Sequence, residues 1–201
     1  MKVPRFATQV QSSMIALVLM SVCSSRTLAQ DHSHTLTSQH QEQTSDQKHQ
    51  AGALLKIVRE ATERFKDVSV AEAEGYSLQF GCVSGPDAGA MGLHFVNGAL
   101  VSGGVVDATR PQIVIYEPTA NGRLRLIGAD YLVIADAWNA KHSGPPELMG
   151  QLFHLFDSPN RFGLPAFYTL HVWAWKDNPN GAFVNWHPNV SCEKFDGQNP
   201  N

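Results

Sequence analysis

The sequence has little charge, almost no cysteine and no long apolar run, and each shortage excludes a class of protein. Charged side chains make up 16% of the 201 residues, and lysine and arginine form no cluster. Nucleic acids and anionic membrane surfaces are therefore not expected partners. The apolar run MIALVLMSV at residues 14–22 is far shorter than the roughly 20 residues that span a bilayer. We predict no transmembrane span.

Residues 51–201 also lack the linear motifs by which many enzymes are identified. They contain no His-x-His, His-Glu-x-x-His or Cys-x-x-Cys, and no Gly-x-Ser-x-Gly elbow of a serine hydrolase. The glycine-rich stretch 85–92 fits neither the dinucleotide fingerprint nor the phosphate-binding P-loop. Any site must therefore be assembled from residues that lie far apart in the sequence, and no reaction can be named.

The first 29 residues have the pattern of an export signal. Lys2 and Arg5 precede the apolar run, and Thr-Leu-Ala at 27–29 is a small-residue cleavage site. Cleavage there would remove three of the 15 basic residues and leave 12 against 18 acidic ones, a net charge of −6. We predict an exported protein, periplasmic or extracellular. Lipidation at Cys23 is a minor alternative, because the residues before it fit a lipobox poorly.

Residues 30–50 are almost wholly polar, and we predict a disordered leader followed by one domain over residues 51–201. Such a segment buries too little apolar surface to offset its ordering entropy. A polar linker is the simple interpretation of this leader, although its histidines could hold Cu²⁺ or Zn²⁺ loosely. These histidines are His32, His34, His40 and His49.

After cleavage only Cys82 and Cys192 remain, an even pair in an oxidising compartment. We predict a disulfide between them; the alternative is two separate buried thiols. The pair is not expected to be redox-active, because no Cys-x-x-Cys motif is present.

The order of patterns predicts an α+β domain, with N-terminal helices packed on a mostly antiparallel sheet. Apolar residues recur at helical spacing over 54–68, and a capping box at 69–72 predicts a short second helix. Strand patterns follow, with a hairpin at Asn121-Gly122. We interpret residues 137–160 as a loop with a helical turn at 147–156. The patterns that follow predict a central strand over residues 167–175 and a return strand over residues 183–186.

Two histidines interrupt apolar strands and are the main candidates for chemistry. His94 and His171 are polar rings that must find a partner when buried. Glu117 ends a neighbouring strand pattern, and its carboxylate could reach the same face. Two imidazoles and one carboxylate suit a divalent metal such as zinc, copper or iron. The alternative is a pair of core histidines satisfied by carbonyl groups, or acid–base chemistry with Glu117 or Asp130 beside a histidine.

Aromatic residues favour a second interpretation, a non-catalytic binding module that recognises a sugar or apolar small molecule. His171, Trp173 and Trp175 share one face of the predicted strand. The indoles could wall a pocket or could be ordinary core residues. A surface interaction protein without a pocket remains a third alternative, and His187 is either a further ligand or a surface histidine. The predicted ligand-binding residues are Trp173, Trp175, Tyr116 and Asn97.

Three segments resemble the signatures of a family of small exported bacterial proteins of unknown function. They are GAMGLHFVN at 89–97, YEP at 116–118 and the stretch from LHVWAW to VSC at 170–192. The resemblance covers roughly residues 55 to 192. It implies a single exported domain, and it supplies no mechanism, because that family has no established activity.

Overall fold

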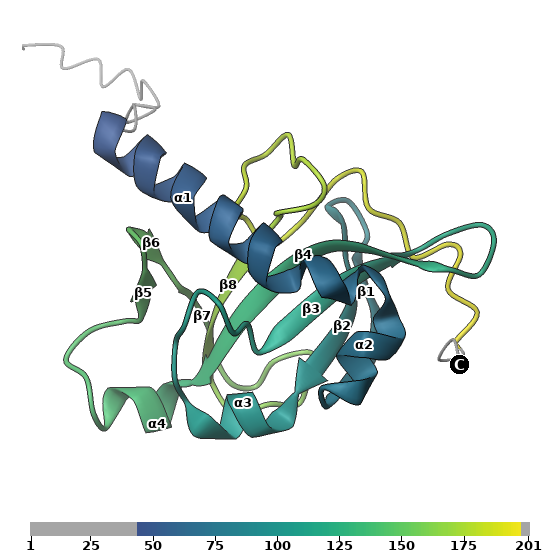
Figure 1. Cartoon of the computed structure of the whole chain (residues 1–201). Helices are drawn as coiled ribbons and strands as arrows, with labels where there is room; N and C mark the ends of the chain where they lie inside the picture. The colour runs from purple at the N-terminus through teal and green to yellow at the C-terminus, as the bar shows by residue number, and fades with distance from the viewer. Residues whose placement is uncertain (1–43, 198–201) are drawn as a thin grey trace, which may run out of the picture. The chain divides into compact units, whose positions relative to one another are not determined.

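A computed structural model describes residues 44–197, which all belong to one compact unit. The unit confirms the predicted α+β class: a helical segment packs on one face of a curled antiparallel sheet (Figure 1). The predicted signal peptide, Cys23 and most of the polar leader lie outside the described residues.

The helices cluster at the start of the described chain. Helix α1 (Ser45–Thr62) is followed by η1 (Glu63–Lys66) and α2 (Val68–Ala73), and the short helices α3 (Gly98–Gly103) and α4 (Ala135–Asn139) come later. Helix α1 begins six residues before the predicted domain boundary. The side chains of Thr44 and Gln47 form a reciprocal capping box there, which satisfies two backbone N–H groups. The polar composition of this segment had led to the prediction of disorder up to residue 50.

Six strands form the main sheet in the order β1-β2-β3-β4-β8-β7, with every neighbouring pair antiparallel. The hairpin predicted at Asn121-Gly122 joins β3 to β4. A separate two-stranded sheet pairs β5 with β6. The strand bounds are β1 Tyr76–Gly85, β2 Gly89–Asn97, β3 Ile113–Pro118, β4 Leu124–Ile134, β5 Glu147–Leu148, β6 Gln151–Leu152, β7 His154–Phe156 and β8 Phe167–Val172.

Three predictions of local structure were wrong. Residues 147–156 form the short strands β5, β6 and β7 and contain no helical turn. Residues 183–186 are turn and coil, and β8 ends at Val172 as the fifth of six strands. The second helix begins at Val68, because Asp67 caps it by accepting a hydrogen bond from the Ser69 amide. In the first two cases tertiary contacts outweigh a local pattern, and in the third a different local cap is used.

The two faces of the sheet carry different cores. Leu54 and Val58 of α1 pack on the face that displays Ala129, Tyr131 and Leu170. The opposite face displays residues of the alternate parity, and it is covered by the segment before β8 and by the C-terminal segment. Its buried residues are Ala90, Ile113, Ile115, Ile127, Leu132, Phe167, Trp173 and Val190.

The predicted disulfide is present between Cys82 and Cys192, whose Cα atoms are 5.7 Å apart. It ties strand β1 to the C-terminal segment across a sequence separation of 110 residues. Within residues 44–197, no helix is long and apolar enough to cross a membrane.

Replacing both cysteines, as in Cys82→Ser with Cys192→Ser, is expected to lower the free energy of unfolding by about 4 kcal/mol. The physical reason is the loop-closure entropy that the crosslink removes from the unfolded chain. Urea unfolding followed by circular dichroism measures the change. The wild-type protein treated with reductant should unfold at the same urea concentration as the double variant. An unchanged midpoint in both would show that the crosslink does not stabilise the fold.

Candidate metal centre

Three polar side chains lie together on the sheet face opposite the helices: His94 of β2, Asp130 of β4 and His171 of β8. Side chains alternate between the two faces of a strand. In β4 and β8, the neighbours of the site residues point toward the helix-covered core, and they include Ala129, Tyr131, Leu170 and Val172.

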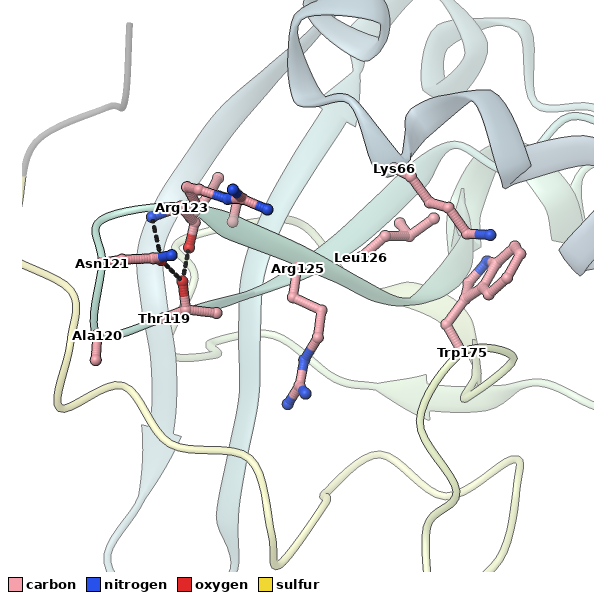
Figure 2. Close-up of a pocket in the computed structure, with 9 residues that line it drawn as sticks. Lys66, Thr119, Ala120, Asn121, Arg123, Arg125, Leu126 and Trp175 are labelled. Carbon is pink, nitrogen blue, oxygen red and sulfur yellow. Dashed lines mark hydrogen bonds between the residues drawn. The ribbon is translucent and has the colours of Figure 1, made fainter.

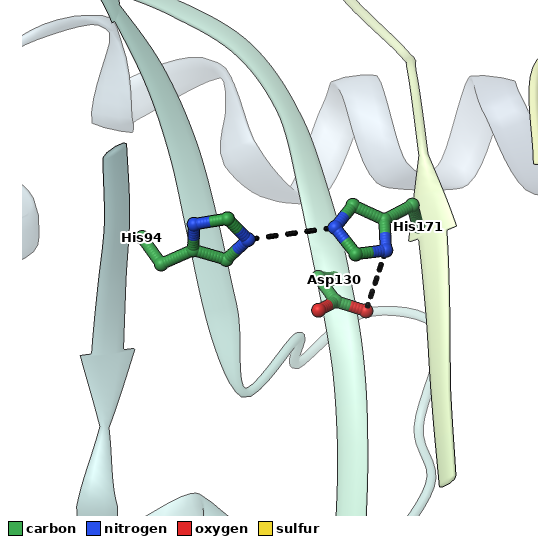
Figure 3. Close-up of side chains that lie close together, drawn as sticks. All are labelled: His94, Asp130 and His171. Carbon is green, nitrogen blue, oxygen red and sulfur yellow. Dashed lines mark hydrogen bonds and ion pairs between the residues drawn. The ribbon is translucent and has the colours of Figure 1, made fainter. Parts of the chain in front are cut away.

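The curl of the sheet brings the two histidines into contact. Strands β3 and β4 separate β2 from β8, so in a flat sheet the two Cα atoms would be about 14 Å apart. The two side chains span much of that distance, and with the curl of the sheet (Figure 1) their Nε2 atoms lie 3.4 Å apart. Figure 3 shows Asp130 beside this pair, on the Nδ1 side of His171.

Hydrogen bonding fixes the tautomer of His94. Its Nδ1 lies 3.2 Å from the carbonyl oxygen of Gly92, which can only accept, so Nδ1 carries the proton. The Nε2 atom is then left with a lone pair that points toward His171. A carbonyl partner on one ring nitrogen is the usual way in which a protein orients a metal-binding imidazole.

Asp130 faces the second nitrogen of the His171 ring. Its Oδ1 accepts a hydrogen bond of 2.5 Å from the Thr169 hydroxyl and lies 3.7 Å from Nδ1 of His171. That distance is too long for a hydrogen bond. Burial lowers the pKa of His171, and the Asn185 side chain is near enough to oppose that shift, but neither its Oδ1 nor the buried Nδ1 of His171 has a partner with hydrogen-bond geometry among the described residues. An unpartnered buried nitrogen is costly and needs an explanation.

Burial shifts the pKa values of all three groups. It lowers the pKa of His94 to about 4, with a further lowering from His171, and it lowers the pKa of His171 to about 3. Burial also raises the pKa of Asp130 to about 6, against the opposing effect of the Thr169 hydrogen bond. At neutral pH both imidazoles are neutral and the carboxyl group is ionised, which are the protonation states that bind a metal.

A small cavity adjoins the three side chains. Its volume is about 30 Å³, and its remaining walls are almost entirely apolar. All three candidate ligands line it. The other lining residues are Phe80, Met91, Ile113, Leu132, Phe156, Phe162, Leu164, Phe167 and Thr169.

The structure brings together two of the three predicted metal ligands and replaces the third. Glu117 does not reach the histidines: its carboxylate binds Lys176 at 2.8 Å and also pairs with Arg125. It lies two residues beyond Ile115, which is the partner of His94 in the ladder. Asp130 pairs with His171 directly and takes the place that Glu117 was expected to hold.

The sequence did contain a signal for Asp130. It interrupts the apolar run Leu-Ile-Gly-Ala-Asp-Tyr-Leu-Val-Ile just as the two histidines interrupt theirs. We considered Asp130 only as an acid–base partner of a histidine, so we did not group it with His94 and His171. Its place opposite His171 depends on the pairing of β4 with β8, which no local pattern specifies.

Three of the predicted ligand-binding residues make structural contacts, and their role in binding a ligand stays a prediction. The Tyr116 hydroxyl donates to the Phe65 carbonyl on the helix-covered face. Asn97 caps α3 by accepting from the Leu100 amide. Trp173 is buried next to the site, and its Nε1 donates to the Val184 carbonyl, so its indole serves as packing.

Trp175 lines an open groove, which has a volume of about 720 Å³ (Figure 2). Its Nε1 donates to Thr62, and Nζ of Lys66 lies 4.0 Å from the centre of its ring. Arg123 and Arg125 lie along the same groove. The continuous aromatic face that was expected on Trp173 and Trp175 is therefore not exposed.

His187 is fully buried, which corrects its interpretation as a surface histidine. Its Nε2 binds the Asp177 carbonyl, and its Nδ1 accepts from the Asn189 amide. Both ring nitrogens are satisfied by the backbone, so His187 has no free nitrogen for a ligand.

Comparison with known proteins gave no match: no protein-family model, no curated protein and no solved structure is similar to this chain. The family resemblance and the export signal therefore stay predictions. Function must be argued from the site itself.

In the metal-free protein, acidification should destabilise the fold from about pH 6.5 downward. The unfolded chain binds protons at both histidines below their ordinary pKa, whereas folded His94 and His171 do not until their lowered pKa values are reached. Asp130 opposes this trend, because its raised pKa lets the folded state take up a proton below about pH 6. Two protons against one give a net loss on the order of 2 kcal/mol at about pH 5.

Urea unfolding in a chelator at about pH 7.5 and pH 5 measures this loss. The variant His171→Gln should lose less stability between the two pH values than the wild type, because one of the two histidines that cause the acid destabilisation is gone. The variant His142→Gln is a control, since His142 is exposed. An equal pH dependence in His171→Gln and wild type would contradict the neutral, buried state of His171.

Proposed function

We propose that the protein binds a divalent first-row transition metal ion at His94, Asp130 and His171. One ligand atom from each residue lies within 4.8 Å of the others, and all three residues are buried. Two imidazoles and one carboxylate suit Zn²⁺, Fe²⁺ or Cu²⁺. The predicted metal site is thus kept, with Asp130 in place of Glu117.

The observation that carries this proposal is the close approach of two Nε2 atoms. In each histidine the other ring nitrogen, Nδ1, faces an oxygen atom that can accept its proton. His94 places its proton on Nδ1 for the Gly92 carbonyl. If His171 likewise places its proton on Nδ1, toward the Asp130 carboxylate, two lone pairs face each other at 3.4 Å. A cation between them turns this repulsion into two coordinate bonds.

The other tautomer of His171 is no better without a metal. With the proton on Nε2, His171 could donate a long hydrogen bond to His94, but the lone pair on Nδ1 would then face the Asp130 carboxylate at 3.7 Å. Two acceptors would oppose each other in a buried site, where unpaired polar groups cost about 1–3 kcal/mol. A metal ion bound to both Nε2 atoms leaves the proton of His171 on Nδ1, toward Asp130, and removes the repulsion between the two lone pairs.

The spacing also fits a metal ion. Two ligands of a tetrahedral ion with bonds of about 2.0–2.1 Å lie about 3.3–3.4 Å apart, which matches the separation of the two Nε2 atoms. The third ligand is a buried carboxylate whose charge no lysine or arginine side chain compensates among the recorded ion pairs of residues 44–197. A divalent cation supplies that compensation.

The test uses the whole chain without a His tag, with the four histidines of the predicted leader changed to glutamine to remove weak sites. We expect this protein to bind one equivalent of Zn²⁺, Fe²⁺ or Cu²⁺. The variants His94→Gln, His171→Gln and Asp130→Asn should each weaken binding by about 100-fold or more. Elemental analysis and competition with a chromophoric chelator measure stoichiometry and affinity.

Two controls keep the result interpretable. The variant His142→Gln removes an exposed histidine and should bind metal as the parent does. Circular dichroism shows whether each site variant remains folded. A folded parent protein that binds none of the three ions, or site variants that bind as tightly as the control, would refute the metal site.

A second candidate function is suggested by the open groove beside Trp175. Lys66, Arg123 and Arg125 line it, and no acidic side chain does. Within residues 44–197 the structure records no hydrogen bond or ion pair for the Arg123 side chain. These charges support a binding module for an anionic sugar more than one for the neutral or apolar ligand first expected.

An acidic oligosaccharide, such as oligogalacturonate, should then bind more tightly than a neutral oligosaccharide of the same length. Fluorescence of Trp175 reports the titration, with Trp175→Phe showing which part of the signal arises there. Arg123→Gln should weaken binding of the acidic probe by about tenfold through loss of one charge contact. Arg161→Gln is a control outside the groove, and equal affinity for both probes would exclude this function.

A further inference from the structure

We propose that the remaining coordination position of the metal takes only a small molecule of one or two heavy atoms, such as water, dioxygen or nitric oxide. We further propose that Phe80 is the gate through which this molecule enters. This inference rests on the proposed metal site and names the class of ligand that it accepts.

The size limit follows from the cavity beside the three ligands. Its volume of about 30 Å³ is close to the share of one water molecule in the liquid. Three protein ligands leave a tetrahedral ion one open position, and this cavity is the space into which that position can point. An organic substrate of several heavy atoms has no room there.

The walls of the cavity offer a larger ligand no polar partner beyond the metal. No lysine or arginine lines the cavity, and its one charged side chain is Asp130. A divalent ion bound to this carboxylate and two neutral imidazoles leaves the site with a positive net charge, so selection rests on size and not on charge. The polar groups of a larger ligand would lose their hydration against phenyl and aliphatic side chains, which is costly.

The wall is thinnest at Phe80. Its ring packs edge-on against Phe162, with 5.4 Å between the ring centres, and it is 47% exposed. It is therefore the one cavity-lining residue whose side chain is also largely in contact with solvent. Phe80 comes from edge strand β1 and Phe162 from the loop between β7 and β8, so this contact joins the edge strand to that loop.

The backbone at Phe80 is arranged as expected for a movable element. Phe80 has φ 65° and Gly81 has φ 63°, both in the left-handed region that a bulky residue rarely adopts. The two residues form an irregularity in the pairing of β1 with β2, between Gln79 and Cys82. Bulges of this kind re-aim a side chain, and strained residues cluster at sites where the strain has a use.

The experiment uses the Fe²⁺-loaded whole chain under anaerobic conditions, with iron content measured before any probe is added. Nitric oxide serves as the small probe, azide as a linear ligand of three heavy atoms and imidazole as a larger ligand. Nitric oxide should give the electron paramagnetic resonance signal of an iron–nitrosyl centre. Fe²⁺ alone gives no conventional signal, so azide and imidazole are each added in excess before nitric oxide, and neither should weaken the nitrosyl signal of the wild-type protein.

Phe80→Gly should open the enclosure, because it removes the ring and relieves the left-handed backbone. Imidazole should then bind, at least about tenfold more tightly than to the wild type. Phe162→Ala should have the same effect from the other side of the gate. Leu152→Ala is the matched control, since Leu152 is an exposed apolar residue that does not line the cavity.

The outcomes separate this inference from the metal site itself. Absence of bound iron would be a failure of the proposed function. If iron binds but nitric oxide gives no nitrosyl signal, the open position is refuted. If azide or imidazole binds the wild type as well as it binds Phe80→Gly, the size limit and the gate are refuted.

Discussion

The curl of the six-stranded sheet is the constraint on which the candidate site depends. His94 and His171 belong to strands that two others separate, and in the curled sheet their ring nitrogens approach to 3.4 Å. Beside this site, Phe80 of edge strand β1 contacts Phe162 of the loop between β7 and β8. The disulfide holds β1 to the C-terminal segment two residues from Phe80. The position of β1, and with it the wall of the site, is thus held by contacts from both of these segments.

The two faces of the sheet differ in role: the helix-covered face contributes mainly apolar packing, and the opposite face carries the candidate site. The face under α1 and α2 contains the larger share of the apolar packing, and its buried tyrosine hydroxyls all find carbonyl partners. The opposite face combines apolar packing with three titratable groups, one of which has an unsatisfied nitrogen. Native interiors rarely keep such an atom without a reason. The contrast within a single sheet is what singles out this cluster as a site.

The two-residue period of the strands predicted which residues share a face of the sheet. It did not predict which residues of different strands lie next to each other. His94 and His171 were identified because each interrupts an apolar strand, and alternation alone places them on a common face. Glu117 obeys the same alternation but lies too far along β3, beyond a register shift after Ile115. Asp130 is correctly placed only through the ladder between β4 and β8. Strand order and register arise from long-range contacts, which a single sequence does not display.

The rigidity of the scaffold decides how the site can exchange with solvent. His94 and Asp130 are paired with a neighbouring strand on both sides, and His171 is paired with Asp130 in the ladder of β4 with β8, so moving any of them would break strand pairing. Strand β1 is at the edge of the sheet and is paired on one side only. Its irregular segment at Phe80 interrupts even that pairing. Access must therefore come from the edge, while the ligand geometry stays fixed by the interior strands, which is the arrangement that a preorganised site requires.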